Sequence, residues 1–197
     1  MAPTLRDPSA NLGRLAVAVR EARGRGATIL VTPELTLSGY DVGDLGDDLT
    51  SPTLLAGVQE VARSSGLTLV VGMALREGDG TSNAAVIVDS SGGLRATYRK
   101  AHLFRDLDAS RFRPGPHATA VAEVDGVRVA CVICYDIEFP ETARAAALGG
   151  AHVLAVPTAN MSPWEVVNES VIPARAFENQ LYVAYANHIA AEGNTSY

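Results

Sequence analysis

The sequence is poor in cysteine, in basic relative to acidic residues, and in long apolar runs. Two cysteines are too few for a disulfide scaffold, so we expect a protein of the reducing cytoplasm. The formal net charge of -6 at pH 7 disfavours nucleic acid as a partner, because phosphates would be repelled. No apolar run is long enough to span a bilayer, and the N-terminus lacks the basic start and apolar core of a secretory signal. We therefore expect neither a nucleic acid nor a membrane as a partner.

What the sequence does contain is typical of one globular domain. Hydrophobic residues make up 47% of the chain and charged residues 19%. A length of 197 residues is enough to bury a sizeable core, and no repeat, low-complexity tract or linker divides it. We predict a single domain over residues 1–197.

Start and stop signals predict four helices. Asp7 is a capping side chain before Pro8, and apolar residues follow at helical spacing until Gly24 or Gly26. Asp136 is positioned to cap a later helix. The predicted helices cover residues 8–24, 53–64, 138–148 and 165–180, the last of them interrupted or begun near Pro173.

Short β-branched apolar runs predict strands, some of them covered on both faces. Asp125-Gly126 separates two runs and is a strong signal for a two-residue hairpin. Segment 37–52 is predicted as a loop, and segment 102–117 as irregular. Strands and helices alternate at both ends while the middle holds consecutive strands, which favours sheets between helix layers and leaves the strand order open. The predicted strands are residues 27–34, 67–75, 83–89, 94–100, 119–124, 127–134, 152–158 and 181–188.

Cys134 is a candidate nucleophile, because it ends a predicted strand just before the helix expected from Glu138. The positive end of a helix dipole there would favour a thiolate and expose the sulfur. The backbone N–H of Tyr135 would point the same way and could hold an oxyanion. Against this, a lone buried cysteine is more often an inert small hydrophobe.

Cys131 and Cys134 also form a C-x-x-C string, which raises a redox or zinc interpretation. Residues three apart in a strand point to opposite faces, so the two sulfurs would diverge. A second cysteine pair that could complete a tetrahedral site is lacking. We therefore assign Cys131 to the core and predict no metal.

Glu34 and Lys100 each end a strand-like run, at residues 27–34 and 94–100. A carboxylate there is costly unless exposed or paired, so Glu34 is either a solvated acid or a desolvated general base with a raised pKa. A terminal lysine is usually a solvated edge charge. With Cys134, however, these two supply nucleophile, proton carrier and oxyanion partner, and strand ends in layered α/β folds are where reactive groups converge.

A cysteine–histidine pair is the rival arrangement. Spacing alone leaves three histidines open as partners of the thiol: His102, His152 and His188.

Three separated strings resemble the carbon–nitrogen hydrolase (nitrilase) superfamily. They are TPELTLSGYD around Glu34, YRKAHLF around Lys100 and CVICYDIEFPE around Cys134. The resemblance spans nearly the whole chain in the family's order. It extends to PTAN at 157–160, RAFEN at 175–179 and YANHIAAEG at 185–193.

The resemblance implies an α/β fold, a four-layer α-β-β-α sandwich that usually assembles into dimers or larger homo-oligomers. It implies Glu34 as base, Lys100 as the cation that stabilises the oxyanion, and Cys134 as nucleophile, with the Tyr135 N–H as a second oxyanion donor. The implied reaction passes through a thioester and releases ammonia or an amine. It requires no metal or organic cofactor.

The residues after the nucleophile indicate the branch of the family. True nitrilases resemble Cys-Trp-Glu, whereas this chain has Cys134-Tyr135-Asp136, closer to amidases and carbamoylases. We predict a small amide or an N-carbamoyl compound as the substrate.

Many amidases of this family place a further glutamate after the lysine, where it helps to position the substrate. The corresponding loop here has only Asp106 and Asp108. We predict Asp108 as the substitute, since a shorter carboxylate serves if the loop moves inward. The alternatives are a solvated acid and a partner for Arg111.

Relatives begin with a strand before the first helix and continue beyond the equivalent of Tyr197. We therefore expect a domain incomplete at both ends. Two functions compete with the amidase: a catalytically silent fragment of the same fold, and a glutaminase module that supplies ammonia to a synthetase.

Overall fold

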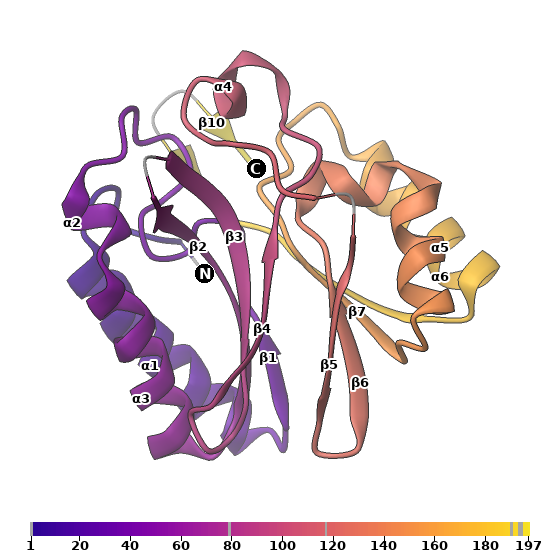
Figure 1. Cartoon of the computed structure of the whole chain (residues 1–197), viewed down its shortest axis with the longest axis horizontal. Coiled ribbons are helices and arrows are strands. Elements are labelled where there is room, and N and C mark those ends of the chain that lie inside the picture. Colours follow the sequence, from indigo (N-terminus) through magenta and orange to yellow (C-terminus); the bar gives the residue numbers. More distant parts are fainter. Residues whose placement is uncertain (1, 79, 117, 190, 193–194) are drawn as a thin grey trace.

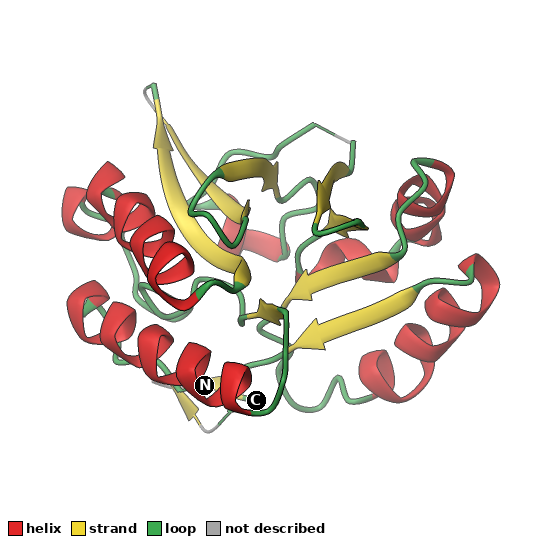
Figure 2. Cartoon of the chain, turned by 90° about the horizontal axis from the view of Figure 1, so that it is seen from below, coloured by secondary structure: helices red, strands yellow, loops and turns green. Residues whose placement is uncertain are grey.

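The computed structural model describes residues 2–78, 80–116, 118–189, 191–192 and 195–197. Two four-stranded sheets face each other, and helices cover their outer sides (Figure 1). The view from below shows the same succession of layers (Figure 2). The predicted four-layer α-β-β-α sandwich is therefore confirmed.

The first sheet has the order β1-β2-β3-β4. β1 pairs with β2 in parallel, and β2–β3 and β3–β4 are antiparallel, so β1 and β4 run the same way. Their carboxyl ends consequently lie at one edge of the sheet. The strands are β1 (Ile29–Val31), β2 (Thr68–Glu77), β3 (Gly80–Val88) and β4 (Leu94–Arg99).

The second sheet has the order β5-β6-β7-β8. β5 and β6 form the predicted hairpin, in which Asp125 and Gly126 adopt left-handed φ values of 50° and 77°. β6, β7 and β8 are parallel, so the segments that follow them emerge at a common edge. The strands are β5 (Ala120–Val124), β6 (Val127–Cys131), β7 (Val153–Pro157) and β8 (Tyr182–Ala186).

Helix ends follow the sequence signals. The side chain of Asp7 accepts a hydrogen bond from the Ala10 N–H at 2.9 Å, and Gly66 ends α3 in the left-handed conformation at φ 68°. α1 and α3 cover the first sheet, and α5 and α6 the second (Figure 1). The long helices are α1 (Pro8–Gly24), α3 (Pro52–Ser65), α5 (Pro140–Leu148) and α6 (Ile172–Asn179), the last continuing a π-helical turn, η2 (Val167–Val171).

Apolar side chains pack in separate layers. Val70 and Ile87 of the first sheet belong to one buried cluster with Ile133 and Leu154. Leu15 of α1 belongs to a second cluster on the other face of the first sheet. β1, β2 and β3 thus contribute side chains to clusters on both faces of the sheet, as the continuous apolar runs predicted, whereas β4 is partly exposed. Within the described part of the chain, no helix has the length and apolar character needed to traverse a lipid bilayer.

Two short helices lie in segments predicted to lack regular structure: α2 (Asp47–Thr50) and α4 (Arg105–Ala109). Apolar periodicity cannot reveal helices of four or five residues. A small antiparallel pair, β9 (Ala191–Glu192) and β10 (Thr195–Ser196), lies near the C-terminus.

Three predicted boundaries around the site were wrong. β1 ends at Val31 and β6 at Cys131, so Glu34 and Cys134 both lie in turns beyond their strands. A 3₁₀ turn, η1 (Cys134–Glu138), precedes α5, and Asp136 does not cap that helix. Its carboxylate instead accepts hydrogen bonds from the Tyr98 hydroxyl at 2.9 Å and the Ile133 N–H at 3.1 Å.

Gly72 of β2 allows the turn that carries Glu34 to pack against the sheet. A Cβ at this position would lie 2.5 Å from the Pro33 carbonyl oxygen and 2.8 Å from the Glu34 Cα. We expect Gly72→Ala to lower the free energy of unfolding by about 1–3 kcal/mol and to reduce activity, because backbone must shift. Gly13→Ala is the control, since a Cβ there meets nothing within 4 Å and alanine favours the helix. Equal urea midpoints for Gly72→Ala and wild type would contradict this role.

Candidate active site

Glu34, Lys100 and Asp108 form one buried charged group. Lys100 Nζ lies 2.7 Å from Glu34 Oε1 and 2.6 Å from Asp108 Oδ2, and all three side chains are fully buried. Glu34 follows β1, and Lys100 directly follows β4, whose carboxyl end lies at the same edge. The fold thus brings together two residues 66 positions apart in sequence.

Cys134 completes the group from the second sheet. It is partly buried, and the charges of Glu34, Lys100 and Asp108 all act on its thiol. The structure therefore brings together the side chains predicted as base, cation and nucleophile. Cys131, in contrast, is fully buried in the core, as predicted.

Burial raises the pKa of the Cys134 thiol well above its usual range, and the charge of Glu34 acts in the same direction. The charge of Lys100 and a hydrogen bond from the Ala159 N–H lower the pKa of the thiol, but by less than burial and Glu34 raise it. The expectation that a helix dipole favours the thiolate was therefore wrong, because the first turn after Cys134 is a short 3₁₀ turn and a buried carboxylate lies nearby. A protonated thiol needs a base to become a nucleophile.

The carboxylate of Glu34 has the properties of such a base. Burial raises its pKa, and the charge of Asp108 adds to this, whereas Lys100 and Asn83 lower it. Burial also acts to lower the pKa of Lys100, but its interactions with the acidic groups of Glu34, Cys134 and Asp108 outweigh burial and raise that pKa above its ordinary value. Lys100 therefore remains an ammonium at neutral pH.

Asn83 was missed from the sequence. Its Nδ2 donates to Glu34 Oε1 at 2.6 Å, the same oxygen that Lys100 contacts, whereas Glu34 Oε2 has no hydrogen-bond partner among the described residues. One carboxylate oxygen is held and the other is left for a proton. The available signal was an amide side chain at the start of the apolar strand β3, where it is fully buried.

Asp108 is neither a solvated acid nor simply a partner for Arg111. Its carboxylate accepts from Lys100, from the Tyr40 hydroxyl at 2.9 Å and from the Phe104 N–H at 2.9 Å, while Arg111 Nη2 lies 3.6 Å away. Tyr40 was also missed from the sequence. Asp108 is buried, which is the inward position that its substitution for the family's glutamate requires, and the substitution itself stays a prediction.

The three rival histidines have other partners. His102 Nδ1 lies 2.8 Å from Asp136 Oδ1, and His152 contacts Arg128. His188 Nε2 lies 2.6 Å from the backbone carbonyl oxygen of Glu34. Among the described residues, none of them hydrogen-bonds to the sulfur of Cys134.

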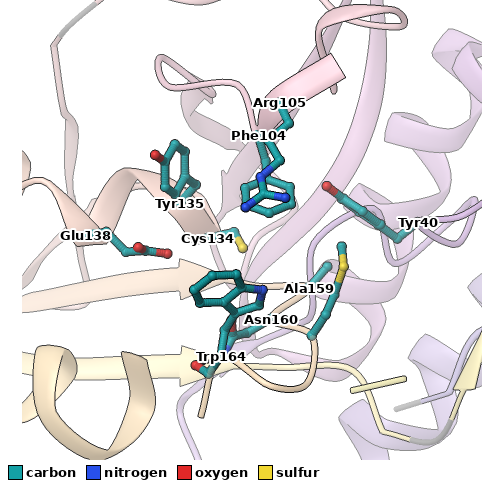
Figure 3. A pocket seen from close by; sticks show the side chains of 10 residues that line it. Tyr40, Phe104, Arg105, Cys134, Tyr135, Glu138, Ala159, Asn160 and Trp164 are labelled. Atoms are coloured by element: carbon teal, nitrogen blue, oxygen red, sulfur yellow. Dashed lines mark hydrogen bonds between the residues drawn. The ribbon is translucent and has the colours of Figure 1, made fainter. Parts of the chain in front are cut away.

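A cavity of about 170 Å³ opens onto Cys134 (Figure 3). Most of its wall is aromatic or apolar, which is typical of a site for a small organic molecule. Tyr135 contributes its ring, which meets Phe104 and Phe139 edge-on. The lining residues are Tyr40, Phe104, Arg105, Cys134, Tyr135, Glu138, Ala159, Asn160, Met161 and Trp164.

The sandwich fold, with a partly buried thiol beside a buried carboxylate and ammonium, defines a hydrolase with a cysteine nucleophile. The chain belongs to the carbon–nitrogen hydrolase family, whose model matches residues 1–197. A Pseudomonas protegens protein described as "Hydrolase in pqqF 5'region" is 43% identical over 97% of this chain and 68% of its own. An (R)-stereoselective amidase from Pseudomonas sp. is 37% identical over 94% of this chain and 67% of its own.

Solved structures lead to the same class. An amidase from Nesterenkonia sp. matches with a TM-score of 0.90 at 32% identity, over 99% of this chain and 76% of that chain. Structures of a glutamate-to-glutamine mutant of the amidase from Nesterenkonia sp. AN1 show acrylamide, or the acetamide moiety of fluoroacetamide, joined to the active-site cysteine. The comparisons support an enzyme with carbon–nitrogen hydrolase activity on amides.

Proposed function

We propose that this enzyme hydrolyses a small amide or N-carbamoyl compound through a thioester on Cys134. The observation that carries the proposal is the buried contact of Lys100 with Glu34 beside the thiol. Asp108 holds the ammonium from its other side. This arrangement supplies a nucleophile, a base and a fixed positive charge at one buried site.

In the first half-reaction Glu34 takes the thiol proton while the sulfur attacks the amide carbon. Lys100 has three N–H donors, and Glu34 and Asp108 engage two of them, so the third can donate to the oxyanion. The Tyr135 N–H is the second proposed donor. The carbon–nitrogen bond breaks, and ammonia or an amine leaves with the proton returned by Glu34.

In the second half-reaction Glu34 takes a proton from water as the water attacks the thioester carbon. The carbon–sulfur bond then breaks, the acid leaves and the thiol regains its proton. Glu34 Oε2, without a hydrogen-bond partner among the described residues, is the oxygen that carries the proton in both halves.

Mass spectrometry of the modified protein tests the nucleophile. We expect fluoroacetamide and acrylamide, which modify the active-site cysteine in a glutamate-to-glutamine mutant of the Nesterenkonia amidase, to add to Cys134 and not to Cys131. Rapid acid quenching during turnover of a panel of small amides should trap an acyl group on the same peptide. Cys134→Ala is the control that should carry no adduct. Labelling of Cys131 alone, or an acyl adduct retained in Cys134→Ala, would refute the assignment.

A further inference from the structure

Two opposite charges line the cavity, and neither has an ion-pair or hydrogen-bond partner among the side chains that the structure describes. Arg105 and Glu138 both border it, and Figure 3 shows their head groups directed toward the space around Cys134. In the described part of the chain, neither side chain forms an ion pair or hydrogen bond, with the other or with any third group. The proposed reaction above uses neither of them.

Glu138 is the less exposed of the two. It is the last residue of η1, the turn that begins with the nucleophile, and its side chain is partly buried. Burial raises the pKa of its carboxyl group, against the opposing effect of Lys100. Lys100 forms its ion pairs with Glu34 and Asp108, and among the described residues it forms none with Glu138. A carboxylate withdrawn from water without a donor is costly, so a ligand that supplies N–H groups would be favoured there.

Arg105 lies at the exposed mouth of the cavity. Its guanidinium carbon is 5.2 Å from the ring centre of Phe104 and 5.8 Å from that of Trp164. Contact with two aromatic faces orients a guanidinium while leaving its N–H edge free for a carboxylate. Arg105 also adopts a left-handed φ of 52°, which is unfavourable for a residue with a side chain and is concentrated at ligand sites.

We propose that the cavity selects an amide that carries both an ammonium and a carboxylate, as asparagine, glutamine and their α-amide isomers do. Glu138 receives the ammonium, and Arg105 receives the carboxylate. The aromatic wall accommodates the short carbon chain that joins these charged groups to the amide. This inference rests on the proposed function, since the amide must also reach Cys134, and it adds the substrate class.

The first experiment measures kcat/KM for ammonia release from butyramide, succinamate, 4-aminobutanamide and the four zwitterionic amides. We expect at least one zwitterionic amide to exceed butyramide about 10-fold or more, because two charge-assisted contacts are made. Arg105→Gln and Glu138→Gln should each lower the ratio of that kcat/KM to the butyramide value by about 10-fold, mainly through KM. Arg95→Gln, an exposed β4 variant outside the cavity, should leave the ratio unchanged.

Calorimetric titration of Cys134→Ala with the same compounds tests selectivity without catalysis. Tighter binding of a zwitterionic amide than of butyramide, lost when Arg105→Gln is added, supports the inference. Equal binding of charged and neutral amides, or a preference untouched by both glutamine variants, overturns it. If the enzyme releases ammonia from butyramide but binds charged and neutral amides equally, only the substrate class is refuted. Selective binding without hydrolysis of any amide would refute only the proposed function.

Discussion

Cys134→Ala is expected to reduce ammonia release about 10⁴-fold or more while the protein remains folded. The thiol is the proposed nucleophile, and removing the nucleophile of a catalytic group leaves only the catalysis that binding and oxyanion stabilisation provide. The side chain is partly buried at the floor of a cavity, so its loss removes little packing. The measurement is steady-state ammonia release, with urea unfolding as the test of the fold.

Cys131→Ala is the matched control for this variant. Cys131 is fully buried in the core and does not line the cavity, so its replacement should lower the unfolding midpoint and leave the rate of the folded protein near that of wild type. The reverse pattern, in which Cys134→Ala is active and Cys131→Ala is inactive, would remove Cys134 from the mechanism.

Lys100→Met is expected to cost both activity and stability. The substitution leaves Glu34 and Asp108 fully buried on either side of the lost ammonium. Breaking a buried ion pair by removing one partner typically costs about 3–5 kcal/mol. We expect the free energy of unfolding to fall by that amount near pH 8. Ammonia release should drop to near background, because the oxyanion loses its cation.

The stability lost in Lys100→Met should increase as pH rises. The pKa of Glu34 is already raised in the folded protein, and removing Lys100 raises it further. A carboxyl group with a raised folded pKa binds its proton more tightly in the folded state, so the variant should lose stability as pH rises above the ordinary glutamate pKa. Urea unfolding at pH 5 and pH 8 should show a smaller deficit for Lys100→Met at pH 5.

Arg63→Met is the control for removing a cation. Arg63 pairs with Glu60 on the surface, where both side chains are more than half exposed, and such pairs contribute little. Its unfolding midpoint should stay close to that of wild type at both pH values. A Lys100→Met midpoint equal to that of wild type at pH 8 would show that the buried charges do not depend on the ammonium.

Local signals in the sequence predicted the local structure well. Asp7 caps α1, Gly66 ends α3, and the Asp125-Gly126 dipeptide forms the hairpin turn between β5 and β6. Each of these features is decided by a few neighbouring residues and their backbone preferences. Asp136 was misassigned because its preferred donors include Tyr98, which is 38 residues away, rather than the helix that follows it.

The sequence by itself determined the layered fold and pointed to Glu34, Lys100 and Cys134, because apolar runs define buried strands and reactive side chains follow the ends of strands, while the resemblance to the family added Asp108. Tertiary structure alone decided which further groups hold them. β3 runs opposite to β4, so Asn83, near the amino end of β3, meets Glu34 and Lys100, which follow the carboxyl ends of their strands. Burial in that place, rather than any neighbour in sequence, keeps the Cys134 thiol protonated and makes Glu34 the stronger base.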